Sequence, residues 1–160
     1  IDLTELEQKG LLSRTHGGAI LKEDPVYGED SISSRREKNK EEKECIAKKA
    51  RAQIEDGDTI LLDSGTTALD LAELLKDIHN LTVITNDLQI ALKLQKYSEI
   101  HLILLGGRVR TSFECTVGGM GIRALEELSV DKVFMTTNAL SLQKGATTPN
   151  LDNAEIENVK

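Results

Sequence analysis

The sequence predicts an α/β fold with a mostly parallel sheet that carries helices on both faces. From residue 59 onward, short apolar segments alternate with amphipathic helical patterns, which is typical of parallel sheets. Hydrophobic residues make up 39% of the 160 residues and charged residues 29%, which suits one packed domain with an appendage. No apolar run approaches the roughly 20 residues needed to span a bilayer. We therefore expect a cytoplasmic protein that does not associate with a membrane.

The first residues predict a short helix followed by a hairpin. Leu3 and Leu6 lie on one helical face, and Gly10 stands where a helix commonly ends. Two extended segments, residues 11–15 and 19–21, flank a Gly-Gly pair that favours a tight turn. A helix followed by such a hairpin is the second half of a winged helix. Residues 1–21 are therefore predicted to be the C-terminal remnant of a winged helix-turn-helix DNA-binding domain.

A linker and a long helix are predicted next. Residues 22–31 contain Pro25, Gly28 and four acidic residues, a composition typical of a linker. Residues 32–54 lack glycine and proline, and apolar side chains at helical spacing favour one long helix. Its dense charge is typical of a solvated face. Residues 32–160 are predicted to form the ligand-binding domain.

The elements of this domain follow from periodicity. Strands are predicted over residues 59–63, 81–85, 100–105 and 131–137, and helices over residues 68–75, 88–92, 122–128 and from Asp152 onward. In open parallel sheets, ligands bind outside the carboxyl ends of the strands. We therefore look for the site in the loops that follow the four strands.

The loop after the first predicted strand has the features of an anion site. It reads Asp63-Ser64-Gly65-Thr66-Thr67 and leads directly into a helix. Backbone N–H groups and the dipole at a helix N-terminus favour an anion, and Gly65 permits its close approach. The alternative is a well-capped helix start, since serine and threonine are common caps.

Two further loops are candidates for the same site. Thr85 and Asn86 end the second strand, where a ligand contact and a helix cap are equally good interpretations. Gly106, Gly107 and Arg108 end the third, and the arginine would place a positive charge near the anion. A surface arginine is the alternative. The polar segment from Asn138 to Pro149 is a candidate lid.

Other classes of function lack support in the sequence. It has neither G-x-G-x-x-G after the first strand nor G-x-x-x-x-G-K-[ST], so dinucleotide and NTP sites are not indicated. The three histidines and two cysteines show no metal-ligand spacing, and we expect no metal and no cofactor. No catalytic triad stands out. The net charge of −7 argues against a broad nucleic-acid-binding surface.

Several short motifs occur in a fixed order along the chain. Residues 2–12 follow the pattern D-L-x-x-L-E-x-x-G-L-L, and the later motifs are RTHGGA (14–19), R-x-x-x-N-x-x-E-K (35–43), LLDSGTT (61–67), VITND (83–87), LLGGRVR (104–110), glycines at 118 and 121, and GATTPN (145–150). This order and spacing resemble the DeoR family of bacterial transcriptional regulators over essentially the whole chain.

The resemblance implies a sensor domain similar to ribose-5-phosphate isomerase, in a repressor of sugar metabolism that is not an enzyme. A phosphorylated sugar would be the effector, held by Asp63, Ser64, Gly65, Thr66, Thr67, Thr85, Asn86, Gly106, Gly107 and Arg108. Arg14 and His16 would belong to the DNA-binding wing. Operator DNA would be bound by the full-length protein only, and a homo-oligomer, dimer or tetramer, is expected. The family pattern also continues past Lys160, so the sensor domain is expected to be incomplete at its C-terminus.

The alternative is a sugar-phosphate isomerase-like enzyme, because a fold does not fix a function. Residues 2–20 discriminate between the two, since an isomerase has no use for the remnant of a winged helix.

Overall fold

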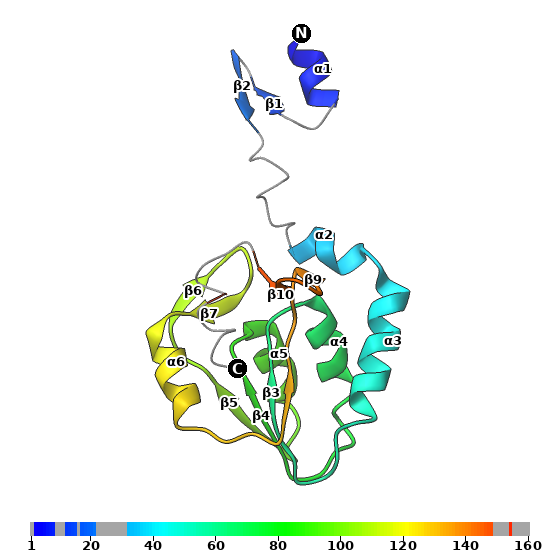
Figure 1. Ribbon diagram of the computed structural model, residues 1–160, viewed down its shortest axis with the longest axis vertical. Coiled ribbons are helices and arrows are strands. Elements are labelled where there is room, and N and C mark those ends of the chain that lie inside the picture. The colour runs from blue at the N-terminus through cyan, green and yellow to red at the C-terminus, as the bar shows by residue number, and fades with distance from the viewer. Residues whose placement is uncertain (1, 9–11, 16, 22–31, 149–153, 155–160) are drawn as a thin grey trace. The chain divides into compact units, whose positions relative to one another are not determined.

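A computed structural model describes residues 2–8, 12–15, 17–21, 32–148 and 154. The chain divides into two compact units, Ile1–Asp30 and Ser31–Lys160, and Figure 1 shows the elements of each. In the first unit, α1 (Leu3–Gln8) begins where Asp2 accepts a hydrogen bond from the N–H of Thr4 at 3.0 Å. β1 (Leu12–Thr15) and β2 (Gly18–Leu21) then pair antiparallel. The hairpin predicted from the Gly-Gly pair is present.

A four-stranded parallel sheet forms the centre of the second unit. Its strands are β3 (Thr59–Leu62), β4 (Leu81–Thr85), β5 (Ile100–Leu104) and β8 (Lys132–Phe134), and their order in the sheet is β5-β4-β3-β8. All neighbouring pairs run parallel, which confirms the predicted sheet. After β5 the chain returns to the other side of β3, so the strand order reverses between β3 and β8. Crevices at such switch points are the usual ligand sites of open parallel sheets.

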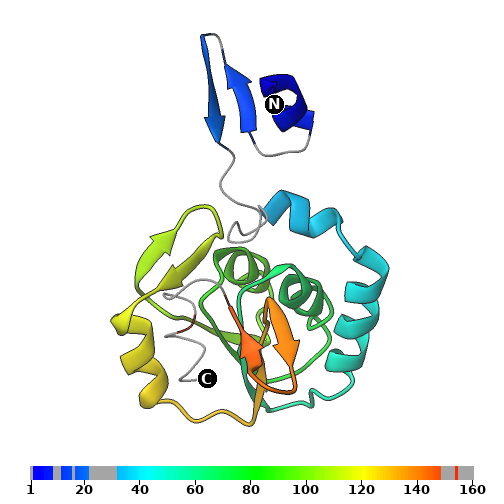
Figure 2. The same cartoon turned by 45° about the horizontal axis from the view of Figure 1, so that its top comes forward.

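Helices cover both faces of the sheet, as the alternating pattern predicts (Figures 1 and 2). α3 (Lys40–Arg51), α4 (Thr66–Glu73) and α5 (Leu88–Leu94) contribute to one core, and α6 (Gly119–Glu126) covers part of the opposite face. The larger core includes Ile60, Leu62, Leu75 and Leu81, each with no exposed surface. Burial of such a side chain stabilises the fold by about 1.5–3 kcal/mol. The packed sheet therefore holds the loops at the ends of its strands in fixed positions.

The helix predicted over residues 32–54 is two helices. α2 (Ile32–Glu37) ends before α3 begins, and Asn39 between them has a φ of 55° and a ψ of 46°. This left-handed conformation cannot continue an α-helix, and asparagine adopts it more readily than most residues. The prediction of one uninterrupted helix was wrong because apolar periodicity does not report a single left-handed residue.

Two segments that the sequence analysis predicts as loops form hairpins in the structure. β6 (Arg108–Arg110) pairs with β7 (Cys115–Val117), and β9 (Ala139–Ser141) pairs with β10 (Gly145–Thr147), both antiparallel. α6 begins at Gly119, three residues before its predicted start. The helix predicted from Asp152 falls mostly outside the described residues. In the described part of the chain, no helix has the length and apolar character needed to cross a membrane.

Candidate ligand-binding site

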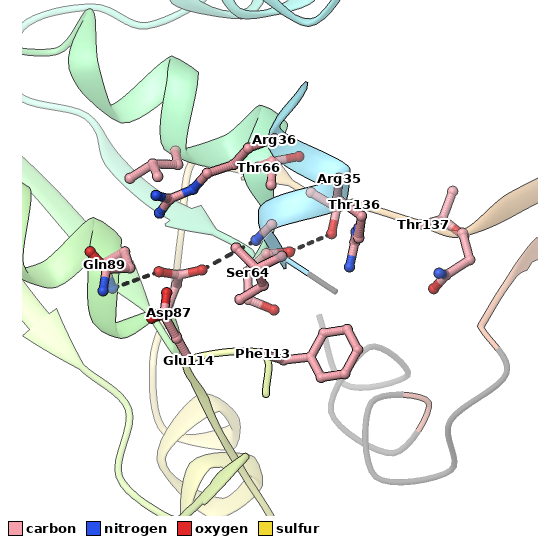
Figure 3. Close-up of a pocket in the computed structure, with 14 residues that line it drawn as sticks. Arg35, Arg36, Ser64, Thr66, Asp87, Gln89, Phe113, Glu114, Thr136 and Thr137 are labelled. Carbon is pink, nitrogen blue, oxygen red and sulfur yellow. Dashed lines mark hydrogen bonds between the residues drawn. The ribbon is translucent and has the colours of Figure 1, made fainter. Parts of the chain in front are cut away.

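A pocket lies at the switch point, beside the carboxyl ends of β3, β4 and β8 (Figure 3). Three of its segments follow strands of the sheet, one comes from the β6–β7 hairpin and one from α2. Their residues are Ser64, Gly65, Thr66 and Leu69 after β3, Asp87 and Gln89 after β4, Phe113 and Glu114 in the hairpin, Thr136, Thr137 and Asn138 after β8, and Ile32, Arg35 and Arg36 in α2.

The N-terminus of α4 forms one side of this pocket. Gly65 precedes the helix with a φ of 146° and a ψ of 163°, a conformation that side chains disfavour. A Cβ atom there would also lie 3.4 Å from the side chain of Thr136. The first N–H groups of α4 have no acceptor within the helix, and the helix dipole favours negative charge beside them. Ser64, Gly65 and Thr66 line the pocket at this helix start, and their binding of an anion stays a prediction.

Asp63 connects the ends of β3 and β8. One carboxylate oxygen accepts hydrogen bonds from the N–H and hydroxyl groups of Thr136, both at 3.1 Å. The other accepts one from the N–H of Ser64 at 2.8 Å. The residue is only 2% exposed and does not line the pocket. Its contacts position the two loops.

Asp87 does line the pocket and also caps α5. Its carboxylate accepts hydrogen bonds from the N–H groups of Gln89 at 2.8 Å, Ile90 at 2.9 Å and Gly65 at 3.3 Å. Burial is the largest influence on this carboxyl group and raises its pKa above the ordinary value, although the three N–H donors act in the opposite direction. Asp87 thus ties the α4 and α5 N-termini together, and it places a carboxyl group beside an anion-type site.

Positive charge reaches the pocket from α2. Arg35 and Arg36 both line it, and Figure 3 shows Arg36 extending over the pocket on the side of Asp87 and Gln89. The opposite side includes Phe113, whose ring lies 4.1 Å from the Arg110 guanidinium carbon, within the range of a cation–π interaction. The pocket therefore combines N–H donors, two arginines, carboxyl groups and one aromatic ring.

Several residues predicted for the site lie near the pocket without lining it. Thr67 is in the first turn of α4 and is half-buried. Thr85 is fully buried, and its hydroxyl accepts a hydrogen bond from the N–H of Asp87 at 3.1 Å. Asn86 donates to the carbonyl of Thr116 at 3.0 Å, whereas its buried Oδ1 has no hydrogen-bond partner in the described part of the chain. Contacts of these side chains with an effector stay predictions.

The predicted Gly-Gly-Arg loop leads into the β6–β7 hairpin. A Cβ atom at Gly107 would lie 2.5 Å from the carbonyl oxygen of Val117, so close packing requires a glycine there. At Gly106 the nearest atom would be the Met120 Cε at 3.9 Å, which leaves ordinary space. Arg108 is exposed at the start of β6, paired in register with Val117, and does not line the pocket. Their roles as effector contacts stay predictions.

In the N-terminal unit, Arg14 lies in β1 opposite Ala19, and His16 lies outside the described residues. Sequence reasoning did not select Arg35 and Arg36 as pocket residues, although Arg35 belongs to a motif quoted above. It also did not select Gln89, Phe113, Glu114, Thr136 and Thr137. Thr136 and Thr137 stand at the carboxyl end of the predicted fourth strand, so the rule that ligands bind outside strand ends could have pointed to them. Among the described residues, no group of three or more His, Cys, Asp or Glu side chains could hold a metal ion.

The structure is that of an α/β domain with a pocket at a topological switch point, where open parallel sheets usually bind their ligands. A family model described as the DeoR C terminal sensor domain matches residues 38–159. The chain belongs to the DeoR family.

Relatives are similar over almost the whole chain. The lactose phosphotransferase system repressor of Staphylococcus aureus is 42% identical over 156 residues, which is 96% of this chain and 61% of the repressor. The HTH-type transcriptional regulator GolR of Listeria innocua is 36% identical over 157 residues, 98% of this chain and 61% of GolR. GlpR of Haloferax volcanii, also an HTH-type transcriptional regulator, is 32% identical over 160 residues, 98% of this chain and 60% of GlpR. The chain thus spans about three-fifths of the length of these relatives.

Proposed function

We propose that this chain is the sensor part of a DNA-binding repressor of sugar metabolism, and that a phosphorylated sugar is its effector. The observation that carries the proposal is the pocket, in which the α4 N-terminus and two arginines meet at the switch point of the sheet. The names of the relatives support the regulatory role, since GolR and GlpR are called transcriptional regulators and the Staphylococcus aureus protein a repressor.

The proposed chemistry divides the effector between two kinds of contact. The phosphate lies against the first N–H groups of α4 and the hydroxyl groups of Ser64 and Thr66, where the helix dipole favours its charge. The sugar hydroxyls lie against polar groups on the remaining sides, including Gln89, Glu114 and Asn138. Such a division makes the phosphate the main source of affinity and the hydroxyls the source of specificity.

Regulation then follows from linkage. The effector changes operator binding only if it binds the DNA-competent and DNA-incompetent states with different affinities. Operator DNA is a partner of the full-length protein, acting in the cytoplasm as a dimer or tetramer. The names of the relatives favour a regulator over the isomerase-like alternative, since each of the three is called a regulator or a repressor.

A thermal-shift experiment on the full chain tests this proposal. The panel contains ribose 5-phosphate, glucose 6-phosphate, fructose 1-phosphate, fructose 6-phosphate and glycerol 3-phosphate, each beside its unphosphorylated parent. At least one phosphate should raise the melting temperature, by an amount equivalent to about 2.7 kcal/mol at 100 times its Kd. Its unphosphorylated counterpart should have no effect. Equal shifts from both members of every pair, or no shift at all, would refute the assignment.

A further inference from the structure

The pocket is too small to enclose a sugar phosphate in the conformation that the structure shows. Its cavity volume is about 30 Å³, which leaves room for only a few water molecules. Ligand pockets in proteins commonly measure about 300–1,000 Å³. If this pocket is to enclose a sugar phosphate, one of its sides has to move; the enclosure rests on the proposed function.

Most sides of the pocket are fixed by hydrogen bonds within the sheet scaffold. Asp63 holds the segment after β8 through Thr136, and Asp87 joins the starts of α4 and α5. The hairpin side is fixed as well, because Leu88 and Thr116 donate backbone hydrogen bonds at 2.8 Å between this hairpin and the end of β4. A displacement of these segments would break several buried hydrogen bonds, each of which is expensive to leave unmade.

The α2 side also has a hydrogen bond, which the Lys43 Nζ of α3 donates to the carbonyl of Arg35, but it is much less buried than the other sides. None of the residues of α2 is buried, and Ile32 and Arg35 are only half-buried. Open grooves of about 570 and 320 Å³ lie next to it, and Arg36 lines both of them as well as the pocket. Asn39, with its left-handed backbone, separates α2 from the packed helix α3 and marks a place where the direction of the chain can change. Little apolar packing therefore opposes a movement of α2.

The charges of the pocket point to the same helix. Among the described residues that line it, Arg35 and Arg36 are the only positively charged side chains, and Asp87 and Glu114 contribute negative charge from the segment after β4 and from the β6–β7 hairpin. An anion beside the α4 N-terminus needs a cationic partner to offset these carboxylates. A guanidinium group provides it and can bind a phosphate through two parallel hydrogen bonds.

We propose that α2 is the movable wall of the effector site: it shifts to admit the sugar phosphate, and Arg35 and Arg36 then hold the phosphate from that side. In the sequence, α2 directly follows the segment 22–31 that leads from the N-terminal unit. A ligand that fixes the position of α2 therefore fixes the helix that comes first in the sensor unit along the sequence. This inference rests on the proposed function and adds the element through which it would operate.

The binding test compares arginine variants of the full chain. Arg35→Gln, Arg36→Gln and the double variant remove charge but keep a polar side chain. Arg123→Gln makes the same change on an exposed position of α6, and Arg108→Gln tests the arginine predicted from the sequence. Calorimetry uses each sugar phosphate of the panel that stabilises the parent, together with inorganic phosphate. The double variant should bind at least about tenfold more weakly, and Arg123→Gln should bind within about twofold of the parent.

The movement is tested by a distance measurement. Spin labels at Ser34→Cys in α2 and Lys96→Cys after α5, with the exposed Cys45 replaced by serine, report the position of α2 relative to the scaffold. Addition of the stabilising sugar phosphate should change the interlabel distance, and the same addition to the double arginine variant at equal occupancy should leave a broader distribution. Circular dichroism confirms that the variants are folded.

The outcomes separate the two proposals. If the parent binds a sugar phosphate and the double variant binds it equally well, the arginines are not phosphate ligands. Weakened binding in Arg108→Gln alone would assign the charge to β6 instead. An unchanged distance at saturation would show that α2 is not the moving wall. If the parent binds no member of the panel, the proposed function fails and this inference with it.

Discussion

The two sides of the pocket differ in how deeply their residues are buried and in how they are held in place. The scaffold side is formed by the ends of β3, β4 and β8 and by the β6–β7 hairpin, and buried carboxylates and backbone hydrogen bonds hold its segments together. The α2 side has no buried residue and carries its two arginines next to open grooves. One side is fixed by buried interactions that are costly to break, and the other lies on the surface of the unit without a buried residue in α2.

This difference separates residues that stabilise the shape of the pocket from residues that are proposed to bind its ligand. Substitutions on the scaffold side should lower the free energy of unfolding, with or without an effector. Substitutions of the α2 arginines should change affinity with little effect on stability, because exposed positions away from the core usually change it by less than about 0.5 kcal/mol. The following predictions test how far the scaffold side extends, from the largest expected effect to the smallest.

Asp63 is expected to be a scaffold residue with a large effect on stability. Asp63→Ala leaves the Thr136 and Ser64 donors without their buried acceptor, so the free energy of unfolding should fall by about 3 kcal/mol. Urea denaturation of the unliganded chain measures this change. Asp77→Ala, at an exposed position after α4, is the control and should stay within about 0.5 kcal/mol of the parent. Equal stability of both variants would show that Asp63 does not stabilise the scaffold side of the pocket.

Gly107 should affect stability more than its neighbour does. In Gly107→Ala the new methyl group would meet the Val117 carbonyl oxygen at 2.5 Å, on a backbone with a φ of 152°, so a loss of about 1–3 kcal/mol is expected. Gly106→Ala meets nothing closer than 3.9 Å and should be tolerated. The same denaturation experiment compares the pair. If both variants are stable and only effector affinity falls, the Gly-Gly loop is a ligand contact, as the sequence predicts.

Asp87 should give the smallest effect, a dependence of stability on pH. Because burial raises its pKa, the folded chain binds a proton at a higher pH than the unfolded chain does. The contribution of this carboxyl group to stability is therefore full below its ordinary pKa and is lost as pH rises through the raised value. Asp87→Asn keeps a good helix cap but does not titrate in this range. The stability of the parent relative to this variant should fall with rising pH, and a relative stability that rises with pH would contradict the assignment.

The sequence by itself determined the class of fold and located one segment of the pocket. Apolar periodicity located β3, β4, β5 and β8 because buried strands and amphipathic helices leave local patterns that need no knowledge of the rest of the chain. The place of the Ser64-Gly65-Thr66 segment at the pocket was predictable for the same reason, since the end of a strand, a glycine and the start of a helix follow one another within a few residues. Its binding of an anion stays a prediction. The ordered motifs also carried the resemblance to the DeoR family, which the match to residues 38–159 confirms.

The tertiary structure alone decided which distant segments share the pocket. The position of β8 beside β3 brings Thr136 to Asp63, 73 residues away in the sequence, and no local pattern encodes that pairing. A left-handed backbone at Asn39 divides the predicted helix, and the resulting α2 places Arg35 and Arg36 along the pocket, although charge patterning alone indicates a solvated face. Local propensities act over a few residues, whereas strand order and helix docking depend on packing between segments far apart in the chain.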